Sequence, residues 1–415
     1  MNCALLIIGD ELLAGRTRDL NGHWLATYLP TVGLKLKQIK IINDNENEIK
    51  SSITELFNNV DIIITSGGLG PTKDDITKNI LAAHFQKELI FDDSSIELIK
   101  KLYAKFDKEW TPSKNAYHYY PRDFELLDNL NGYAPGLLYN SGEKTILSAP
   151  GVPREFKSMV ENTFVPRLKE IYSSDHFKVT TLFSIRTKGV PEEVIFGELC
   201  PTLWDDLSKI AKVSSLPHLL GIDIVLYFNL ENEEETISKA KSIIEASALK
   251  DYVWQYGNLE LEELIVKEAT DKKITIGFAE SCTGGLTSSK ITNISGSSSV
   301  FYGSIVSYAN SVKTNILKVK SSTLENFGAV SEECAKEMAF GAREALECDI
   351  AISYTGIAGP GGGTPTKPVG TVGIGWATKN ENSSTMVYHK GDRIGLKERF
   401  SRSGLFKLLE LIRGH

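Results

Sequence analysis

The sequence predicts an α/β protein with three parts: a doubly wound N-terminal domain, a small α+β middle module and a C-terminal α/β domain. Near both ends of the chain, short apolar runs alternate with helical periodicity, which is typical of α/β domains. Between them lies a shorter, more acidic stretch with two strand patterns and two helical patterns. A chain of 415 residues is also too long for one hydrophobic core. We therefore expect domains at residues 1–172, 177–256 and 257–415.

The N-terminal domain begins as a βαβαβ pattern. The predicted elements are strands at 4–8, 34–42 and 60–65 and helices at 19–28 and 47–57. Such units form a parallel sheet with helices on both faces, and ligands bind beyond the carboxyl ends of its strands. Because the third strand leads directly into the glycine-rich loop 66–72, we expect a binding site there.

The rest of the chain shows the same kinds of pattern. The middle module has predicted strands at 179–186 and 221–229 and helices at 192–199 and 233–248. The C-terminal domain has predicted strands at 274–279, 300–308, 349–355 and 369–377, with helices at 259–270, 331–347 and 396–412. Strands and helices therefore alternate again after the middle module.

Composition and charge exclude several classes of protein. Hydrophobic residues make up 41% of the chain and charged residues 24%, as in globular rather than disordered or fibrous proteins. The formal net charge of −7 argues against nonspecific binding to nucleic acid or anionic membranes. We find neither a signal-peptide pattern nor an apolar run near the roughly 18 residues of a membrane helix. Five scattered cysteines without a CxxC pair suggest neither disulfides nor zinc, so we expect a cytoplasmic protein.

A candidate nucleophile lies in the loop 279–285, between a predicted strand and a predicted helix. This position can present the Ser281 hydroxyl at the sheet edge and direct free backbone N–H groups at the same point, as in an oxyanion hole. Ser281 fits equally well as a helix N-cap followed by glycines. Cys282 is the rival nucleophile, but no histidine lies beside it in the sequence, so packing is the preferred interpretation.

Activation of a serine requires a base. A Ser-His-Asp triad is weakly supported, although not excluded, because the C-terminal domain holds only His389, in a strand-like stretch, and the terminal His415. The alternative is a lysine made neutral by burial and assisted by a tyrosine hydroxyl. Lys313 and Tyr308 stand where a strand ends and a helix begins, although each also fits a purely structural role.

Two further segments could hold an anion. Residues 355–364 follow a predicted strand, and their backbone amides could surround a phosphate, although a mobile surface loop is an equal alternative. Arg393, just before the last helix, offers a guanidinium to the same anion. The candidate substrate-binding residues of this domain are Thr283, Gly284, Gly285, Thr355, Gly356, Gly359 and Arg393.

Four segments of the C-terminal domain, in this order, resemble the PncC family of nicotinamide mononucleotide amidases. They are 279–285, 308–313, 355–364 and 391–393. The resemblance implies Ser281 as the nucleophile, Lys313 as the general base and Tyr308 as its partner, with Thr355 and Arg393 near the substrate. It also implies an amidase that uses no cofactor.

The loop after the third predicted strand carries the candidate site of the N-terminal domain. The candidate phosphate-binding residues are Gly67, Gly68, Gly70 and Thr72. Residues 72–75 fit a capping box, which gives Asp75 a structural role. Asp74 is not explained in this way, and its carboxylate could hold a divalent metal ion that bridges pyrophosphate oxygens. The candidate metal ligands are Asp74, Asp75 and Glu11.

Four N-terminal segments resemble the CinA family of competence/damage-inducible proteins. They are 9–15, Asp19 with Asn21, 66–75 and 150–155. The resemblance implies a MoaB/MogA-like N-terminal domain, a KH-like middle module and a PncC-like amidase domain, in a homodimer. It implies metal-dependent hydrolysis of ADP-ribose and related dinucleotides by the first domain. A nucleotide or pterin binder without turnover is the alternative for that domain.

The middle module departs from nucleic-acid-binding KH domains. Residues 189–192 read Gly-Val-Pro-Glu instead of GxxG, and the module carries eight Lys and Arg against twelve Asp and Glu. A DNA-binding role, suggested by the family's name, therefore finds no support in the charge. We expect an enzyme of pyridine nucleotide salvage with nicotinamide mononucleotide and ADP-ribose as partners, and with no nucleic acid or membrane partner.

Overall fold

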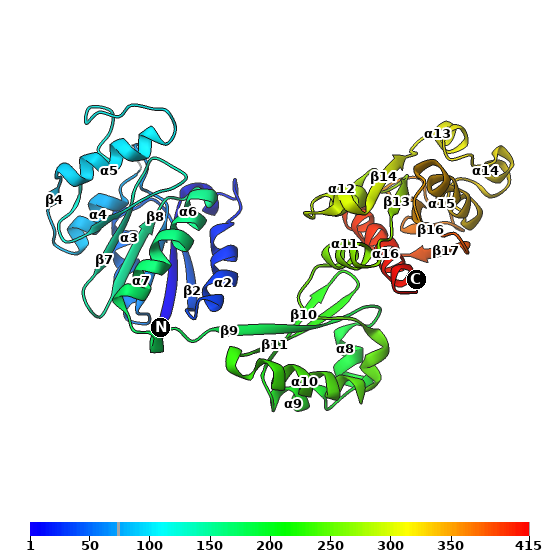
Figure 1. The fold of residues 1–415 in the computed structure, drawn as a ribbon, viewed down its shortest axis with the longest axis horizontal. Helices are drawn as coiled ribbons and strands as arrows, with labels where there is room; N and C mark the ends of the chain where they lie inside the picture. The colour runs from blue at the N-terminus through cyan, green and yellow to red at the C-terminus, as the bar shows by residue number, and fades with distance from the viewer. Residues whose placement is uncertain (73–74, 415) are drawn as a thin grey trace. The chain divides into compact units, whose positions relative to one another are not determined.

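The computed structural model describes residues 1–72 and 75–414 (Figure 1). The chain divides into two compact units, and the division passes through the middle module. The first unit comprises Met1–Phe183, Thr202–Ser214 and Leu226–Ser247, and the second comprises Ser184–Pro201, Ser215–Val225 and Ala248–His415. The three domain boundaries expected from the sequence stay a prediction.

A six-stranded sheet forms the centre of the first unit, in the order β2-β1-β3-β8-β7-β6. Its strands are β1 (Asn2–Ile8), β2 (Lys35–Ile42), β3 (Ile62–Ser66), β6 (Glu125–Leu127), β7 (Gly136–Asn140) and β8 (Thr145–Ala149). The first four strands in this order pair in parallel, whereas β7 and β6 pair antiparallel. The sheet is therefore mixed rather than wholly parallel, because the short turn between β7 and β8 can join only antiparallel neighbours.

Helices cover both faces of this sheet (Figure 1). The α-helices described within residues 1–172 are α1 (Asp10–Leu13), α2 (Asn21–Thr31), α3 (Glu46–Phe57), α4 (Thr77–His84), α5 (Asp93–Ala104), α6 (Pro153–Met159) and α7 (Val165–Ile171), beside the small ribbon β4 (Leu89–Ile90) and β5 (Tyr120–Pro121). Of these, α5 packs in a separate cluster with Trp110 and Tyr117. Leu5 of β1 packs with α2, α6 and α7, while its neighbour Leu6 packs with α3 and α4. Burial on both faces explains why β1 is an unbroken apolar run.

The helix predicted at 47–57 is confirmed as α3. The Asn45 side chain accepts hydrogen bonds from the backbone N–H groups of Asn47 and Glu48, which caps the start of the helix. Ile49, Ile53 and Leu56, which follow the helical period, are fully buried.

The middle module contains a four-stranded sheet in the order β10-β11-β9-β12. Its elements are β9 (Thr180–Thr187), α8 (Glu192–Val194), α9 (Leu203–Ser208), β10 (Lys212–His218), β11 (Gly221–Asn229), α10 (Glu233–Glu245) and β12 (Val253–Tyr256). The predicted strands at 179–186 and 221–229 are confirmed as β9 and β11. The predicted helix at 192–199 is a single turn, α8, that continues as a π-helical turn, Ile195–Leu199.

A second mixed sheet, in the order β14-β13-β15-β16-β17, lies in the second unit. Its strands are β13 (Ile276–Glu280), β14 (Phe301–Val306), β15 (Ile350–Gly356), β16 (Thr371–Ala377) and β17 (Asn382–Tyr388). β13 pairs in parallel with both β14 and β15, and β16 and β17 continue the sheet antiparallel. The loops that follow β13 and β15 therefore leave the same edge of the sheet.

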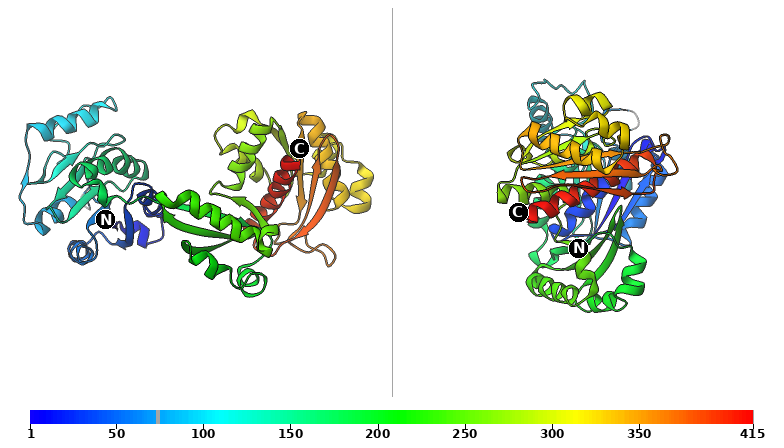
Figure 2. Two further views of the ribbon diagram at one scale, coloured as in Figure 1. Left: turned by 60° about the horizontal axis from the view of Figure 1, so that its bottom comes forward. Right: turned by 90° about the vertical axis from the view of Figure 1, so that its right-hand side faces the viewer.

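Helices also cover both faces of this sheet (Figure 2). The helices of this domain are α11 (Leu261–Lys272), α12 (Leu286–Thr292), α13 (Asn310–Asn315), α14 (Ser321–Phe327), α15 (Glu332–Leu346) and α16 (Arg393–Gly414). Phe400 of α16 packs with Phe278 of β13 on one face, and Met338 of α15 packs with Ala279 on the other. Among the helices of the described residues, none is both long and apolar enough to cross a membrane.

Candidate active site

The structure places Ser281 directly after β13, at the carboxyl edge of the second sheet. Its backbone N–H donates to the carbonyl oxygen of Tyr354 in β15 at 2.9 Å, which holds the loop against the neighbouring strand. Its hydroxyl lies 3.1 Å from Nζ of Lys313, which α13 carries. Ser281 is 8% exposed and Lys313 only 1%. The predicted nucleophile and base are therefore brought together in a nearly buried contact.

Lys313 has an environment that favours a neutral amine. Its Nζ also donates to the carbonyl oxygens of Ser307, at 2.7 Å, and Tyr308, at 3.3 Å. In the described part of the chain, no carboxylate forms an ion pair with it. Burial lowers the pKa of Lys313, and the nearby thiols of Cys334 and Cys282 offset only part of that effect. A lysine with a lowered pKa can accept the proton of a hydroxyl.

Tyr308 contacts the candidate base through its backbone. Its carbonyl oxygen accepts the hydrogen bond from Lys313, whereas the residue is 65% exposed. The structure thus gives the tyrosine a part in positioning the amine. Proton transfer by its hydroxyl stays a prediction.

Glu280, the last residue of β13, organises the loop and was missed by sequence reasoning. It is fully buried, and its Oε2 accepts from the N–H groups of Gly285, at 2.9 Å, and Thr287, at 3.2 Å. Its Oε1 accepts from both the N–H and the hydroxyl of Ser288. The carboxylate therefore satisfies the free amides at the start of α12, where a negative charge is favourable.

The other backbone amides of this loop differ in their acceptors. The N–H of Gly284 donates to the carbonyl oxygen of Ser281 at 3.1 Å, and Glu280 occupies that of Gly285. Within residues 1–72 and 75–414, the N–H groups of Cys282 and Thr283 have no oxygen acceptor. Both N–H groups do interact with the Cys282 thiol, and the predicted oxyanion hole stays a prediction. The Thr283 hydroxyl is fully buried and also has no protein partner in that described part.

Cys282, the rival nucleophile, has an unreactive environment. It is 7% exposed, and burial raises the pKa of its thiol to about 12. The thiol therefore stays protonated near neutral pH, whereas attack requires the thiolate. This favours the interpretation of Cys282 as a packing residue.

The two candidate anion-binding segments are joined by one contact. Arg393, at the start of α16, donates from Nη1 to the carbonyl oxygen of Gly359 at 2.5 Å. The Thr355 hydroxyl donates to the carbonyl oxygen of Ala329 at 2.6 Å. A Cβ on Gly356 would lie 2.7 Å from the carbonyl oxygen of Thr371, so close packing of two strands requires that glycine. The substrate roles of these residues stay predictions.

His389 occupies a structural position outside this constellation. Its Nε2 lies 2.9 Å from the Ser403 hydroxyl of α16, and burial lowers its pKa. The other histidine considered, His415, lies outside the described residues. The geometry therefore favours lysine over histidine as the base for Ser281.

The first unit contains a cleft of about 920 Å³ at the carboxyl ends of β1, β3 and β8. Its volume is in the usual range for small-molecule sites. Five of the predicted residues line it: Glu11, Gly67, Gly68, Gly70 and Asp75. Gly67 has φ of 112°, and a Cβ there would lie 2.3 Å from the carbonyl oxygen of Ile8. Only glycine allows the loop to turn at this point.

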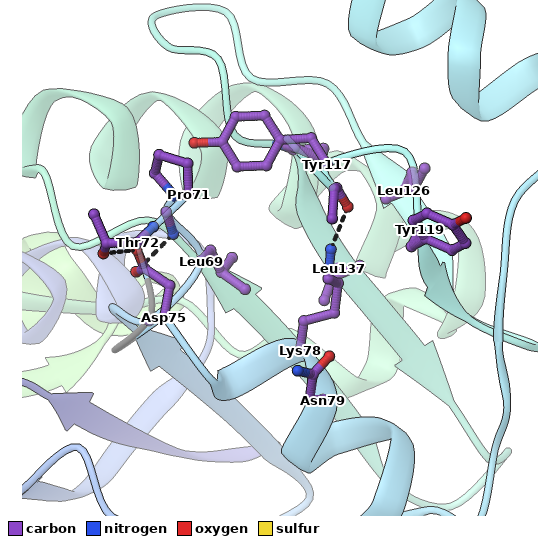
Figure 3. A pocket seen from close by; sticks show the side chains of 14 residues that line it. Leu69, Pro71, Thr72, Asp75, Lys78, Asn79, Tyr117, Tyr119, Leu126 and Leu137 are labelled. Atoms are coloured by element: carbon purple, nitrogen blue, oxygen red, sulfur yellow. Dashed lines mark hydrogen bonds between the residues drawn. The ribbon is translucent and has the colours of Figure 1, made fainter. Parts of the chain in front are cut away.

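Thr72 borders an adjoining hollow of about 200 Å³, together with Lys78 and Tyr117 (Figure 3). Sequence reasoning missed Lys78, which donates from Nζ to the carbonyl oxygen of Ala116 at 2.5 Å. Burial lowers the pKa of Lys78 to about 8. Sequence reasoning also assigned no role to Asn21. This residue is buried, and its side chain donates to the Ser66 hydroxyl and the Gly151 carbonyl oxygen, each at 2.9 Å. The positions of Lys78 and Asn21 depend on contacts between segments that are distant in the sequence, which a local pattern does not predict.

Asp75 closes the loop instead of capping a helix. Its carboxylate accepts from the N–H groups of Gly70, at 2.7 Å, and Thr72, at 2.9 Å, and from the Thr72 hydroxyl (Figure 3). The predicted capping box over 72–75 is wrong, because α4 begins only at Thr77. Asp74 lies outside the described residues.

The described residues do not by themselves form a metal site. Among residues 1–72 and 75–414, no group of three or more His, Cys, Asp and Glu side chains could hold a metal ion. Both oxygens of Asp75 already accept hydrogen bonds from the loop. Metal ligation by Glu11, Asp74 and Asp75 stays a prediction.

Comparisons with known proteins identify the families that the two ends of the chain match. The family described as "Probable molybdopterin binding domain" matches residues 4–170, and the CinA C-terminal domain family matches residues 258–412. A competence-damage inducible protein of Alkaliphilus metalliredigens is 36% identical over 397 residues, which are 95% of each chain. The chain belongs to the CinA family. A Clostridium beijerinckii relative is 34% identical over 414 residues, 99% of this chain and 100% of its own.

Solved structures of CinA proteins match part of the chain. A competence/damage inducible protein from Agrobacterium tumefaciens is 36% identical and covers 37% of this chain and 96% of its own, with a TM-score of 0.35. The CinA protein from Thermoplasma acidophilum is 28% identical and covers 41% of this chain and 98% of its own, with a TM-score of 0.37.

Proposed function

We propose that the C-terminal domain of this CinA protein deamidates nicotinamide mononucleotide. The observation that carries the proposal is the contact of 3.1 Å between Ser281 Oγ and Lys313 Nζ, both nearly buried. The resemblance of the surrounding segments to nicotinamide mononucleotide amidases supports the choice of substrate. The direct test is ammonia release from nicotinamide mononucleotide by the full-length protein.

In the proposed reaction, neutral Lys313 takes the proton of Ser281 as Oγ attacks the carboxamide carbon. The N–H groups of Cys282 and Thr283, which interact with the Cys282 thiol, would turn to the oxyanion of the tetrahedral intermediate. Protonated Lys313 then gives its proton to the leaving nitrogen, and ammonia departs. Water attacks the resulting ester and releases nicotinate mononucleotide, which regenerates the serine.

We further propose that the N-terminal domain hydrolyses ADP-ribose with the help of a divalent metal. The cleft of about 920 Å³, its glycine-rich loop and the buried Asn21 support nucleotide binding there. A nucleotide or pterin binder without turnover is the alternative, since the matching family is named for molybdopterin binding. AMP release from ADP-ribose, measured with and without divalent metal, distinguishes the two.

Asp74→Asn is expected to remove metal-dependent AMP release from ADP-ribose, because it takes away the carboxylate charge that a hard divalent cation prefers. Ammonia release should stay near the wild-type rate, since Ser281 lies in the other compact unit. Ser281→Ala is the matched control, with the opposite expected pattern. Unchanged AMP release by Asp74→Asn would refute its role as a metal ligand.

The middle module is expected to bind neither RNA nor DNA at physiological salt. Its acidic excess opposes a polyanion, and residues 189–192 lack the GxxG sequence that clamps a nucleic-acid backbone. The measurement is a salt titration of the full-length protein against labelled single-stranded RNA and double-stranded DNA. Tight binding that weakens with salt would contradict this expectation.

A further inference from the structure

Lys397 is a cation beside the candidate active site that the proposed reaction leaves unused. It lies in the second turn of α16 and is half-buried. Its Nζ lies 4.0 Å from the position that a Cβ would take on Gly284. Because Gly284 is three residues after Ser281, the Lys397 ammonium group lies beside the loop that carries the nucleophile.

Most cations of α16 are engaged with acceptors. Arg399 donates to the carbonyl oxygen of Leu219, Arg402 lies 3.7 Å from Glu260, Lys407 pairs with Glu410, and Arg413 pairs with Glu268. Lys397, by contrast, has no hydrogen bond or ion pair within residues 1–72 and 75–414.

The nearest acidic residues along the helix do not neutralise Lys397. Glu398 pairs with Lys290 at 2.9 Å, and Asp392 accepts from the N–H of Gly395 at 2.7 Å. Glu280, behind the loop, already accepts from several donors at the start of α12. The positive charge of Lys397 therefore stays available to a ligand.

Arg393 and Lys397 lie on one face of α16, because residues four apart are neighbours along a helix. Arg393 contacts Gly359, in the loop after β15, and Lys397 approaches Gly284, in the loop after β13. These parallel strands are neighbours, so both loops leave the same edge of the sheet, on which α16 packs. Two cations thus stand at the edge that presents Ser281.

We propose that Lys397, together with Arg393, binds the phosphate monoester of the substrate and so selects nucleotides over nucleosides. A phosphate dianion matches two cations, and an ammonium group is a compact donor to its oxygens. The inference rests on the proposed amidase function and adds to it a determinant of substrate class. Lys397 acts in binding and not in the chemical step, so its effect falls on KM.

The test compares two amides that differ only in the phosphate: nicotinamide mononucleotide and nicotinamide riboside. With the full-length protein, Lys397→Gln is expected to raise KM for the mononucleotide by about 10- to 100-fold, as expected for a lost charge-assisted hydrogen bond. Its kcat should stay within about twofold of wild type, and KM for the riboside should not change. Lys397→Arg should restore most of the affinity, because it keeps the charge. Lys267→Gln, which removes an exposed lysine paired with Asp271 on α11, is the matched control and should change nothing.

An equal loss on both amides, or an unchanged KM for the mononucleotide, would overturn the role of Lys397. If the wild-type protein releases no ammonia from either amide, the amidase proposal fails. A binding measurement then tests the proposed phosphate site independently of activity. The probe is then ribose 5-phosphate in calorimetric titrations, with ribose as the control. Binding that Lys397→Gln weakens by at least tenfold would support the site, whereas equal binding, or none by the wild-type protein, would refute it.

Discussion

Ser281→Ala is expected to abolish ammonia release from nicotinamide mononucleotide while leaving the fold intact. The substitution removes the oxygen that lies 3.1 Å from Lys313 Nζ. Loss of the nucleophile in serine hydrolases costs kcat about 10⁶-fold, so a loss of at least about 10³-fold is expected here. The cost in stability is expected to be about 1 kcal/mol, because one hydrogen bond is lost at a site that accepts a smaller side chain. Steady-state ammonia release and the thermal unfolding midpoint measure the two effects.

Cys282→Ala is the control that separates the two nucleophiles. The thiol is buried with its pKa raised to about 12, so its removal should leave kcat/KM within a few-fold of wild type. Cys282→Ala should lower the free energy of unfolding, because the side chain belongs to the core of the second unit, and such a loss does not bear on the choice of nucleophile. If Cys282→Ala stops ammonia release and Ser281→Ala does not, the serine mechanism is wrong.

Much of the fold could be predicted because buried strands have a simple pattern. β1 and β3 are covered on both faces, and each contains an apolar run, Cys-Ala-Leu-Leu-Ile-Ile in β1 and Ile-Ile-Ile in β3. Strands at exposed edges lack this pattern. β17 reads Asn-Ser-Ser-Thr-Met-Val-Tyr and is only partly buried, and β10 has a single buried residue, Val213, so neither was predicted. Their pairing depends on neighbours that the local sequence does not specify.

Some features of the candidate site could likewise be predicted from the sequence, and others could not. Ser281 directly follows β13, and Lys313 lies in α13, shortly after β14. Because β13 and β14 are parallel neighbours, the meeting of the two residues at one sheet edge follows from topology. The engagement of Glu280 with the start of α12, and the approach of Lys397 to Gly284, require side-chain packing between segments. Lys397 is 113 residues beyond Gly284 in the chain, and its local sequence does not predict that the two residues lie close together.

Lys313→Arg is expected to reduce ammonia release almost as much as Ser281→Ala. An arginine stays protonated at any accessible pH and cannot accept the proton of Ser281. In the wild-type protein, burial lowers the pKa of Lys313 from that of a free lysine, so the neutral base is available at a lower pH. The value of kcat/KM should therefore fall as the pH falls through this lowered pKa. At pH values well below the pKa, the fall should be about tenfold for each pH unit. A rate that is independent of pH, or that rises as pH falls, would contradict Lys313 as the base.

The same lowered pKa makes an independent prediction for stability. At pH values between the lowered pKa of Lys313 in the folded protein and its pKa of about 10.5 in the unfolded chain, Lys313 is mostly neutral in the folded state and mostly protonated in the unfolded state. The unfolded state therefore binds more protons in this range. The free energy of unfolding of the wild-type protein should therefore rise with pH across this window, relative to that of Lys313→Met, which has no such proton. Denaturant titrations of both proteins at several pH values measure the difference. A constant difference would show that Lys313 keeps an ordinary pKa, and a neutral lysine could then no longer explain how Ser281 is activated.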